Sequence, residues 1–494
     1  MPSGCSAPCC RRRAGPLRST VAGETVIEGS RGEADHFLRT GASTEAERGM
    51  RSEGRGAVRV WLIKIGESLP LFHPEDRQHR MGILARHLVD AGHSVVWWNS
   101  TFDHARKRHE VAGDQRIEVS PKLTYRLLRG VSYSRNVSPR RILDHWLIGR
   151  KFRRYAYSEP RPDVIVCSFP TIELSDEATK YGRQCGVPVL LDIRDLWPDV
   201  MLDVIPSIIV PLGKAALAPY FRMARRACSR AAGLLGITKE FVDWGVERAG
   251  REPSPMDRCF PLANDAERPP AAEVEAARER WSALGLRDSD FVVCFVGIMG
   301  TRRLLDLDTV IAAAKELQHV APTCKFVLCG SGDSFEHYQR AAQGCSNVVM
   351  PGWADRAAMW TLVRMASVGL TPYTNTFSFL MSYPNKAVEY LSAGLPIVSG
   401  LGGALSRLLA DWRCGVTYPE GDHAALAGVI RNLAEDRAKL DRMRGQSALL
   451  YRSKFDPAKV YASMVSHIED VALGRLRRTG PCGPESETAK PNGI

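Results

Sequence analysis

Two charged side chains lie in the first turns of a short predicted helix, within the segment Met381-Ser-Tyr-Pro-Asn-Lys-Ala-Val-Glu389. Pro384 favours a first helical turn because its φ is fixed, and Ser382 is a suitable N-cap before it. The backbone N–H groups of that turn form the positive end of the helix dipole, beside the ammonium of Lys386. This arrangement predicts a phosphate site. Glu389, one turn further on, is placed to accept hydrogen bonds from sugar hydroxyls.

The same two charged residues admit a simpler interpretation. Lys386 and Glu389 are separated by three positions, so they can form an ordinary ion pair on a helix surface. Gly394 and Pro396 then end the helix before a buried strand. This segment by itself does not decide between a ligand site and a capped surface helix.

A second set of cations follows a predicted buried strand earlier in the chain. Gly297 and Gly300 allow close approach to the backbone, and Arg302 and Arg303 offer forked donors for phosphate oxygens. Glycines at a strand end usually only make a turn, but the two arginines favour an anion site. With Lys386 they predict a seat for a diphosphate that requires neither a metal nor a cofactor. The absence of a clustered Asp pair argues against a magnesium-dependent transferase.

The elements that must position these residues form two series of alternating strands and helices. One series opens with a strand at Val58–Ile65, the second with a strand at Phe291–Gly297, and the composition shifts between them. We therefore predict an α/β fold of two doubly wound, Rossmann-like domains that face a central cleft. The predicted divisions are a disordered extension (1–56), an N-terminal domain (57–270), a C-terminal domain (271–455), a final helix (456–473) and a disordered tail (474–494).

The net charge of +12 in 494 residues favours an anionic partner, which includes nucleic acid, anionic membranes and phosphorylated substrates. Nucleic acid is disfavoured because no nucleic-acid-binding motif accompanies the charge. Most of the 13 cysteines are isolated in apolar segments, which predicts a reducing, cytoplasmic setting without a zinc site. Residues 1–56 lack the apolar core of a secretory signal, and prolines interrupt the apolar stretch Val204–Phe221, so no spanning helix is expected.

A basic segment from Lys122 to Arg154 surrounds the apolar run Trp146-Leu-Ile148. An amphipathic helix with cations beside a tryptophan-containing face suits the surface of an anionic bilayer. The alternative is a solvated helix face that covers the core of its own domain. On the first interpretation the protein is peripheral on the inner face of the cytoplasmic membrane.

Arg194 and Asp195 follow the predicted strand Val187–Ile193 directly. Charged residues at the carboxyl end of a strand in an open α/β sheet point into the crevice where such folds bind ligands. A purely structural ion pair is the alternative, and position alone favours the functional one.

The order of motifs resembles a known family. FVGIMGTRR, FVLCGSGD, NVVMPGWAD, SVGLTPY and SYPNKAVEYLSAGLPIVS occur in the second half, and DIRDLWPD and PLAND in the first. The chain resembles, over about residues 57–472, the retaining GT-B glycosyltransferases of group 1, family GT4, in the branch that builds bacterial capsules, O-antigens and exopolysaccharides.

The resemblance implies a nucleotide-sugar donor, with UDP as the expected nucleotide, in the C-terminal domain and a lipid-linked or oligosaccharide acceptor in the N-terminal one. It implies that Glu389 binds the ribose and that Arg302 or Arg303, Lys386 and the amides near Ser382 contact the diphosphate. The remaining residues that it implies are, on the donor side, Gly297, Gly300, Gly330, Gly332, Trp353, Ala354 (the base), Tyr373 and Asn385, and on the acceptor side, Arg80, Arg194 and Asp195.

The chain departs from the family pattern at two places. Met381 replaces the first Glu of the E-x7-E motif, which leaves the identity of the donor sugar open. The segment His73–Gly82 replaces the glycine-rich loop after the first strand, so recognition of the acceptor is expected to differ. Two other interpretations remain: an enzyme similar to UDP-sugar 2-epimerases, and a non-catalytic subunit that binds nucleotide or membrane in a polysaccharide assembly complex.

Overall fold

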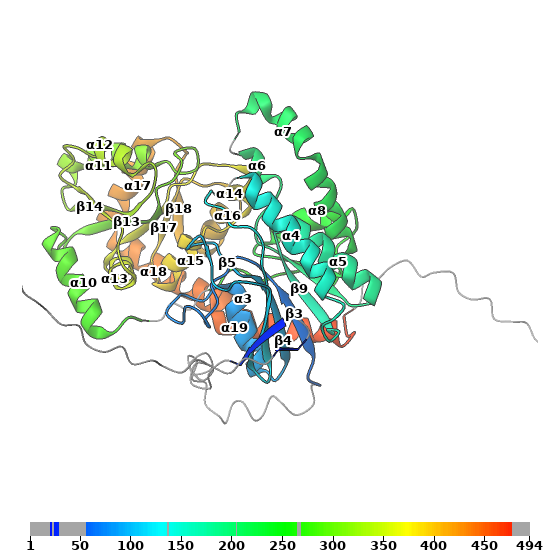
Figure 1. Ribbon diagram of the computed structural model, residues 1–494. Helices are drawn as coiled ribbons and strands as arrows, with labels where there is room; N and C mark the ends of the chain where they lie inside the picture. Colours follow the sequence, from blue (N-terminus) through cyan, green and yellow to red (C-terminus); the bar gives the residue numbers. More distant parts are fainter. Residues whose placement is uncertain are drawn as a thin grey trace, which may run out of the picture.

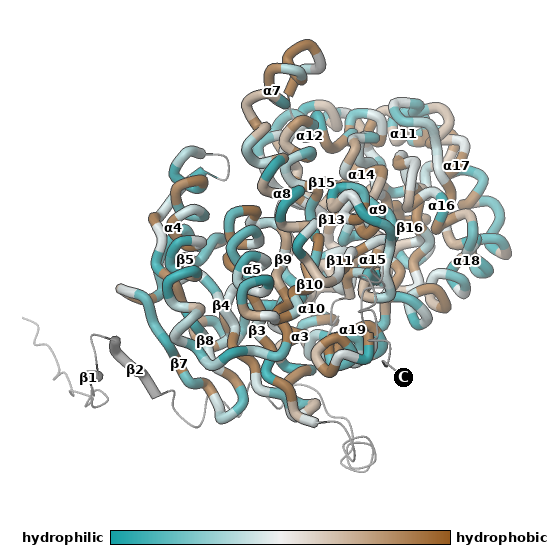
Figure 2. Tube along the Cα trace, turned by 90° about the vertical axis from the view of Figure 1, so that its right-hand side faces the viewer, coloured by the Kyte–Doolittle hydropathy of each residue, from teal (hydrophilic) through white to brown (hydrophobic). Residues whose placement is uncertain are grey.

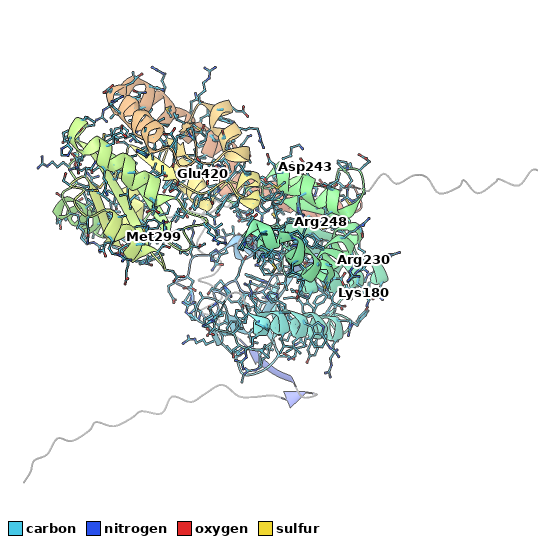
Figure 3. The ribbon with its side chains drawn as sticks, turned by 90° about the horizontal axis from the view of Figure 1, so that it is seen from above. Lys180, Arg230, Asp243, Arg248, Met299 and Glu420 are labelled. Atoms are coloured by element: carbon cyan, nitrogen blue, oxygen red, sulfur yellow. The ribbon has the colours of Figure 1, made fainter. Side chains whose placement is uncertain are left out.

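The computed structural model describes residues 20–21, 24–28, 56–135, 138–203, 205–263 and 268–476. They form two α/β lobes, one for each half of the chain (Figure 1). Seen from above, Met299 and Glu420 belong to one lobe, and Asp243, Arg248, Arg230 and Lys180 to the other (Figure 3).

The N-terminal lobe is built on a sheet whose neighbours are parallel except for the pairs β1–β2 and β7–β8. In sheet order its strands are β1 (Thr20–Val21), β2 (Glu24–Glu28), β7 (Gln115–Ser120), β8 (Leu123–Leu128), β4 (Ser94–Ser100), β3 (Arg59–Ile63), β9 (Val164–Phe169), β10 (Val189–Ile193), β11 (Gly233–Gly236) and β12 (Arg258–Cys259). A separate antiparallel pair comprises β5 (Phe102–Asp103) and β6 (Arg108–His109).

Helices cover both faces of this sheet, so its central strands are buried and mostly apolar. One face carries α4 (Pro139–Tyr155), α5 (Ile172–Cys185), α8 (Ala218–Arg230) and α9 (Lys239–Ala249). The other carries α3 (Arg80–Asp90) and, from the far end of the chain, α19 (Pro457–Ala472). Figure 1 shows α19 beside α3. The short elements α6 (Val200–Asp203), η1 (Ser207–Ile209) and α7 (Val210–Ala216) connect β10 to α8.

The C-terminal lobe is an all-parallel sheet. Its order is β15 (Val348–Gly352), β14 (Cys324–Ser331), β13 (Phe291–Ile298), β16 (Val368–Thr371), β17 (Ile397–Ser399) and β18 (Gly415–Thr417). Its helices are, on one face, α10 (Ala271–Ala283), α13 (Arg356–Met365), α15 (Asn385–Ser392) and α16 (Gly403–Trp412), and on the other, α11 (Leu307–Val320), α12 (Phe335–Ala341), α17 (His423–Glu435) and α18 (Arg437–Leu450). Two short helices, α14 (Phe377–Met381) and the π-helical η2 (Tyr451–Phe455), complete the lobe.

In both sheets the strand order reverses beside the first strand of the series, between β3 and β9 and between β13 and β16. This is the switch point of a doubly wound fold, where the carboxyl ends of the strands leave room for a ligand. The predicted α/β class with two doubly wound, Rossmann-like domains is therefore confirmed. Within the described residues, no helix combines the length and the apolar composition that crossing a bilayer requires.

The structure differs from the sequence predictions in several local elements. The basic segment was predicted as one helical region, but Leu123–Leu128 is strand β8. This strand pairs with β4 through its backbone, and most of its side chains are buried. From Val210, within the apolar stretch Val204–Phe221, the chain continues as two helices, α7 and α8, that are divided at Leu217, just before Pro219. Strands β1 and β2 lie within the extension predicted to be disordered. The rest of residues 1–55, and 477–494 of the predicted tail, lie outside the described residues.

The contact between α19 and the N-terminal lobe gives a first prediction. Ile468 of α19 is completely buried in the core beneath α3, whereas Ala462 on the same helix is exposed. Replacing Ile468 with Ala should lower the free energy of unfolding by about 2–5 kcal/mol, because it leaves a cavity. Urea denaturation monitored by circular dichroism measures this. The control, Ala462→Ser, should change stability by less than about 0.5 kcal/mol. Equal effects of the two substitutions would contradict this packing.

A buried carboxyl on α4 gives a second prediction. Asp144 is 2% exposed and accepts a hydrogen bond from the backbone N–H of Val131, at 2.9 Å. Burial raises the pKa of Asp144 to about 6, so the folded state binds this proton more tightly than the unfolded state. Stability contributed by the protonated carboxyl is then present below the unfolded pKa and is lost as the pH rises to about 6.

Asp144→Asn should therefore stabilise the protein at pH 8, by at most roughly 3 kcal/mol, and should have little effect at pH 4. Thermal unfolding of both proteins across this pH range measures the difference. A variant that is less stable at both pH values would show that the carboxylate, and not the neutral group, is preferred at this site.

Candidate functional site

Glu389 binds two cations, one from each lobe. One of its carboxylate oxygens accepts a hydrogen bond from Lys386 Nζ at 2.7 Å, and the other from Arg77 Nη1 at 3.0 Å. Lys386 lies on the same helix, α15, whereas Arg77 lies in the loop before α3 of the N-terminal lobe. We call Arg77, Lys386 and Glu389 the interdomain triad.

The environment of the triad keeps its carboxylate charged. Burial by itself would raise the pKa of Glu389, but Lys386 and then Arg77 more than offset this and hold it below its ordinary value. About a quarter of each side chain of the Lys386–Glu389 pair is exposed. The ion pair that the simpler interpretation predicted is therefore present, but it is partly buried and includes a residue from the other lobe.

The helix that carries Lys386 begins two residues later than the sequence predicted. Its N-cap is Pro384, and no side chain caps it. Ser382 instead ends the preceding helix, with its backbone N–H donated to Phe379 O at 3.3 Å, so the prediction of Ser382 as the N-cap is wrong. Asn385, the first residue of α15, is exposed. The first turn of α15 is thus open to a ligand rather than covered by a capping side chain.

The loops after β13 and β16 meet beside the triad. The backbones of Leu305 and Tyr373 form a bridge, and Thr374 Oγ1 donates to Arg303 O at 2.7 Å. The ring of Tyr373 stacks on Phe379 at 4.8 Å. Burial, with a smaller contribution from Glu389, raises the pKa of Tyr373 to about 12, so its hydroxyl is protonated at neutral pH and is able to donate.

The two arginines predicted to hold a diphosphate are both exposed in the loop after β13. Arg302 donates to Asp308 Oδ2 through Nε at 3.1 Å and Nη2 at 2.9 Å. Because 55% of the Arg302 side chain is exposed, this ion pair is weak and can exchange for an anionic ligand. A phosphate contact by Arg302 therefore requires release of Asp308.

The glycines of this region have structural reasons of their own. A Cβ on Gly330 would lie 1.9 Å from Gly297 O, and one on Gly332, whose φ is +142°, would lie 2.5 Å from Met299 O. These residues let the ends of β13 and β14 approach closely. Near Gly300, by contrast, an added Cβ would meet only Ile298, at 3.9 Å. Donor contacts by the four predicted glycines stay a prediction.

The residues predicted to hold a base lie after β15. The side chain of Trp353 is 63% exposed, and that of Ala354 is 9% exposed and belongs to the core of the C-terminal lobe. An exposed tryptophan at the carboxyl edge of a parallel sheet is an available stacking surface. Their role as base contacts stays a prediction.

Met381 occupies the interface between the lobes. Its carbonyl accepts a hydrogen bond from Thr238 Oγ1 at 2.7 Å, and its side chain packs against the core of the N-terminal lobe. Nearby, Ser378 Oγ donates to Asp203 Oδ2 at 2.9 Å. The residue that replaces the first Glu of the motif thus contributes apolar packing between the lobes.

On the N-terminal side, Arg80 is not available to a ligand. Its side chain is 1% exposed and makes a bidentate ion pair with Asp192, at 2.9 Å for both contacts. A third donor, Nη1, binds Pro261 O at 3.1 Å. The predicted acceptor-side role of Arg80 is therefore corrected to a structural one, because all of these contacts lie within the lobe.

Arg194 and Asp195 do lie at the carboxyl edge of the sheet. Arg194 Nη1 donates to Glu67 Oε1 at 2.5 Å, and Asp195 is exposed. Desolvation raises the pKa of Asp195 against the opposing effect of Lys64 and Arg194. Burial, followed by the charge of Arg194, lowers the pKa of Lys64 to about 8.

Sequence reasoning missed Lys64, Glu67 and Arg77. Lys64 and Glu67 follow the first strand of the N-terminal series, and Arg77 lies within the segment His73–Gly82 that replaces a glycine-rich loop. Their position could have identified them as candidates, because residues after the first strand of a doubly wound sheet lie at its switch point. The partner of Arg77 is far away in the sequence and was not predictable.

Within the described residues, His73, Asp103 and Glu110 form a group whose donor atoms are close enough to share a metal ion. Their own contacts explain the group without one. His73 Nε2 lies 3.1 Å from Glu110 Oε1, and Asp103 Oδ2 accepts from Arg106 Nη1 at 3.1 Å. The arrangement ties the loop that carries Arg77 to the β5–β6 hairpin.

A comparison with protein families finds a match within the C-terminal lobe. Residues 290–436 match the family "Glycosyl transferases group 1". No curated protein matches by sequence.

Solved structures resemble nearly the whole described chain. Sucrose-phosphate synthase from Thermosynechococcus elongatus aligns at 17% identity and a TM-score of 0.61, over 84% of this chain and 100% of that one. HepE from Anabaena, in complex with UDP, aligns at 13% identity and a TM-score of 0.55, over 84% of this chain and 100% of that one. Trehalose 6-phosphate synthase from Burkholderia multivorans aligns at 14% identity and a TM-score of 0.56, over 85% of this chain and 100% of that one. At these identities the likeness shows the shared GT-B fold.

The buried Arg80–Asp192 pair gives a third prediction. Arg80→Met should lower the free energy of unfolding by about 3–5 kcal/mol, because it leaves the buried carboxylate of Asp192 without its partner. Urea denaturation measures this loss. The matched control is Arg302→Met, which removes an exposed ion pair and should cost less than about 1 kcal/mol. Unchanged stability of Arg80→Met would refute the structural role.

Proposed function

We propose that the chain is a retaining glycosyltransferase that moves a sugar from a nucleotide diphosphate, a UDP-sugar, to a lipid-linked or oligosaccharide acceptor in bacterial surface polysaccharide biosynthesis. The observation that carries this proposal is the interdomain triad at the switch points of two doubly wound lobes. The match of residues 290–436 to the group 1 family, and the UDP and UDP-glucose complexes of HepE, support it.

The triad suggests how a donor is held. Glu389 is ionised and would accept hydrogen bonds from the hydroxyls of a ribose, in exchange for its contact with Arg77. Lys386 and the open first turn of α15 would bind the diphosphate, with Arg302 and Arg303 on its other side. Trp353 would stack on the base. The predicted donor contacts therefore all lie at the carboxyl edge of one sheet.

The reaction needs no protein nucleophile. The bond between the anomeric carbon of the sugar and the diphosphate oxygen breaks, and a bond to the acceptor hydroxyl oxygen forms on the same face. The acceptor proton passes to the diphosphate oxygen that departs. Lys386, Arg302 and Arg303 stabilise the negative charge that develops there, without a metal. Contact between the lobes limits entry of water.

Association with the cytoplasmic face of an anionic membrane forms part of the proposal. Within Lys122–Arg154, Arg126 is buried in strand β8, so only the outer face of α4 fits the predicted membrane surface. That face exposes Ile142, Leu143 and Trp146. Figure 2 shows the largely apolar α7 projecting from the lobe, and there Leu212 is 72% exposed.

A non-catalytic binding subunit is the second candidate, and Met381 is the observation that favours it. If the first motif Glu is required for transfer, an apolar residue there leaves a protein that binds donor without turnover. Anomeric NMR of the product separates the candidates. Transfer with retention supports the enzyme, inverted product refutes the mechanism, and nucleotide binding without transfer or epimerisation supports the subunit.

The fourth prediction concerns the donor site. UDP should stabilise the protein in thermal-shift titration more than GDP, ADP or CMP, because binding to the folded state raises the melting temperature. Glu389→Gln should weaken UDP affinity at least about tenfold, since it removes a charged hydrogen-bond acceptor.

The matched control is Glu240→Gln. Glu240 forms another ion pair between the lobes, with Arg407, at a distance from the triad in the sequence. This control should bind UDP as the unmodified protein does. An equal loss in both variants would mean that Glu389 acts only through contact between the lobes.

A further inference from the structure

Four cations gather at the carboxyl edge of the N-terminal sheet. Lys64 follows β3, Arg194 follows β10, Lys107 lies in the turn between β5 and β6, and Arg141 lies on α4. We call these four residues the cation cluster. All four are intermediate in exposure, although Lys107 is in a surface hairpin.

Aromatic rings hold two members of the cluster. Lys107 Nζ lies 5.2 Å, and Arg141 Cζ 5.9 Å, from the centre of the Tyr133 ring. Arg141 also lies 5.3 Å from the Trp197 ring. The hydroxyl of Tyr133 is 2.8 Å from His104 Nδ1. Tyr133 therefore brings cations from a hairpin and a helix to one place.

The backbone supports this placement of Lys107. Its φ is 56°, in the left-handed region that side chains other than glycine rarely adopt. Such a conformation costs on the order of 1–3 kcal/mol and persists only where the surroundings hold it. In this hairpin the ammonium of Lys107 lies over the Tyr133 ring.

Five carboxylates interact with members of the cluster, namely Glu67, Asp103, Asp144, Asp192 and Asp195. Glu67 is bound to Arg194, and Asp103 is bound to Arg106. Asp195 faces Lys64, Arg194 and Arg141, and Asp144, buried beneath, interacts with Arg141. Glu67, Asp103 and Asp192 are therefore engaged by arginines, and Asp195 is the exposed carboxylate that interacts with the cluster.

Mutual repulsion among the cations is visible in their acid–base properties. Burial, and then Lys107, Arg141 and Lys64, lower the pKa of His104 to about 4. Burial, followed by Arg141, also lowers the pKa of Lys107. A bound anion would relieve this repulsion, so the grouping of the cations favours binding of an anion.

We propose that Lys64, Lys107, Arg141 and Arg194, of which Lys107 and Arg141 share the Tyr133 ring, bind the phosphate or diphosphate group of the acceptor substrate. This inference rests on the proposed function, because it assigns the acceptor to the N-terminal lobe. The cluster is contiguous with the donor side. His79 interacts with Glu67, Arg194, Arg77 and Lys64, and Arg77 contacts Glu389.

The neighbouring surface suggests what such an acceptor carries. Ile142 and Leu143 follow Arg141 on α4 and are 52% and 45% exposed. An aliphatic chain attached to the bound diphosphate would lie against them. The diphosphate has two sources, a lipid-linked acceptor or a soluble phosphorylated one, and the two are distinguished below.

Isothermal titration of the full chain with inorganic pyrophosphate tests the site. Lys107→Met/Arg141→Met should weaken binding at least tenfold, whereas Lys107→Arg/Arg141→Lys should retain most of it. The charge-matched control, Arg222→Met/Arg225→Met, removes two exposed cations of α8 that lie outside the cluster. It should bind pyrophosphate as the unmodified protein does. Melting temperatures confirm that each variant is folded. Unchanged affinity of Lys107→Met/Arg141→Met would overturn the proposal.

The outcome does not depend on the donor site. Because pyrophosphate can also occupy the proposed donor seat of Arg302, Arg303 and Lys386, the titrations are made at saturating UDP. Arg302→Met/Arg303→Met should then keep the pyrophosphate binding that Lys107→Met/Arg141→Met loses, and the cluster variant should keep its response to UDP. Failure of the proposed function would appear as no UDP response in any variant. Failure of this inference would appear as pyrophosphate binding that disappears only in Arg302→Met/Arg303→Met.

Farnesyl diphosphate distinguishes the two sources. Binding more than about tenfold tighter than that of pyrophosphate, with the difference removed by Ile142→Ser/Leu143→Ser, supports a lipid-linked acceptor. Equal affinities that both fall in the cluster variant support a soluble phosphorylated acceptor at the same site.

Discussion

The carboxylate of Glu389 is held by one cation from each lobe, and the proposed function depends on this contact. A partly buried carboxylate is costly unless it is paired, and Lys386 and Arg77 together keep it ionised. The pairing has a second consequence. A ligand hydroxyl that takes the place of Arg77 would bind Glu389 and release a link between the lobes in the same step. On the proposed function, donor binding and the relative position of the lobes would thereby be coupled.

The N-terminal lobe separates its charges into two kinds. The Arg80–Asp192 pair is fully enclosed, and its hydrogen bonds within the lobe leave no donor for a substrate. Lys64, after β3, and Arg141, on α4, are partly exposed and close to other cations. The enclosed pair is structural, whereas the partly exposed cations are the ones proposed to bind the acceptor. Burial therefore decides which of two similar charged residues is structural.

Met381 replaces the first Glu of the family motif, and its surroundings explain why an apolar residue fits there. Beside the N-terminal core, an ionised Glu would be desolvated unless a cation were close by. A methionine fills the same space with apolar contacts. Its carbonyl bond to Thr238, with the Ser378–Asp203 bond nearby, makes the segment before α15 part of the interface between the lobes.

The α/β class and the two doubly wound sheets followed from the sequence, because strand and helix periodicity are short-range properties. Local motifs also singled out the segment around Lys386 and Glu389, whose role in binding a donor stays a prediction. The sequence placed Arg80 and Arg194 together on the acceptor side, although only Arg194 lies at the sheet edge. Only the tertiary structure decided that Arg77 contacts Glu389 and that Lys107 and Arg141 share Tyr133. Such contacts join residues distant in the chain, and their energies depend on burial and on neighbouring charges that no local pattern encodes.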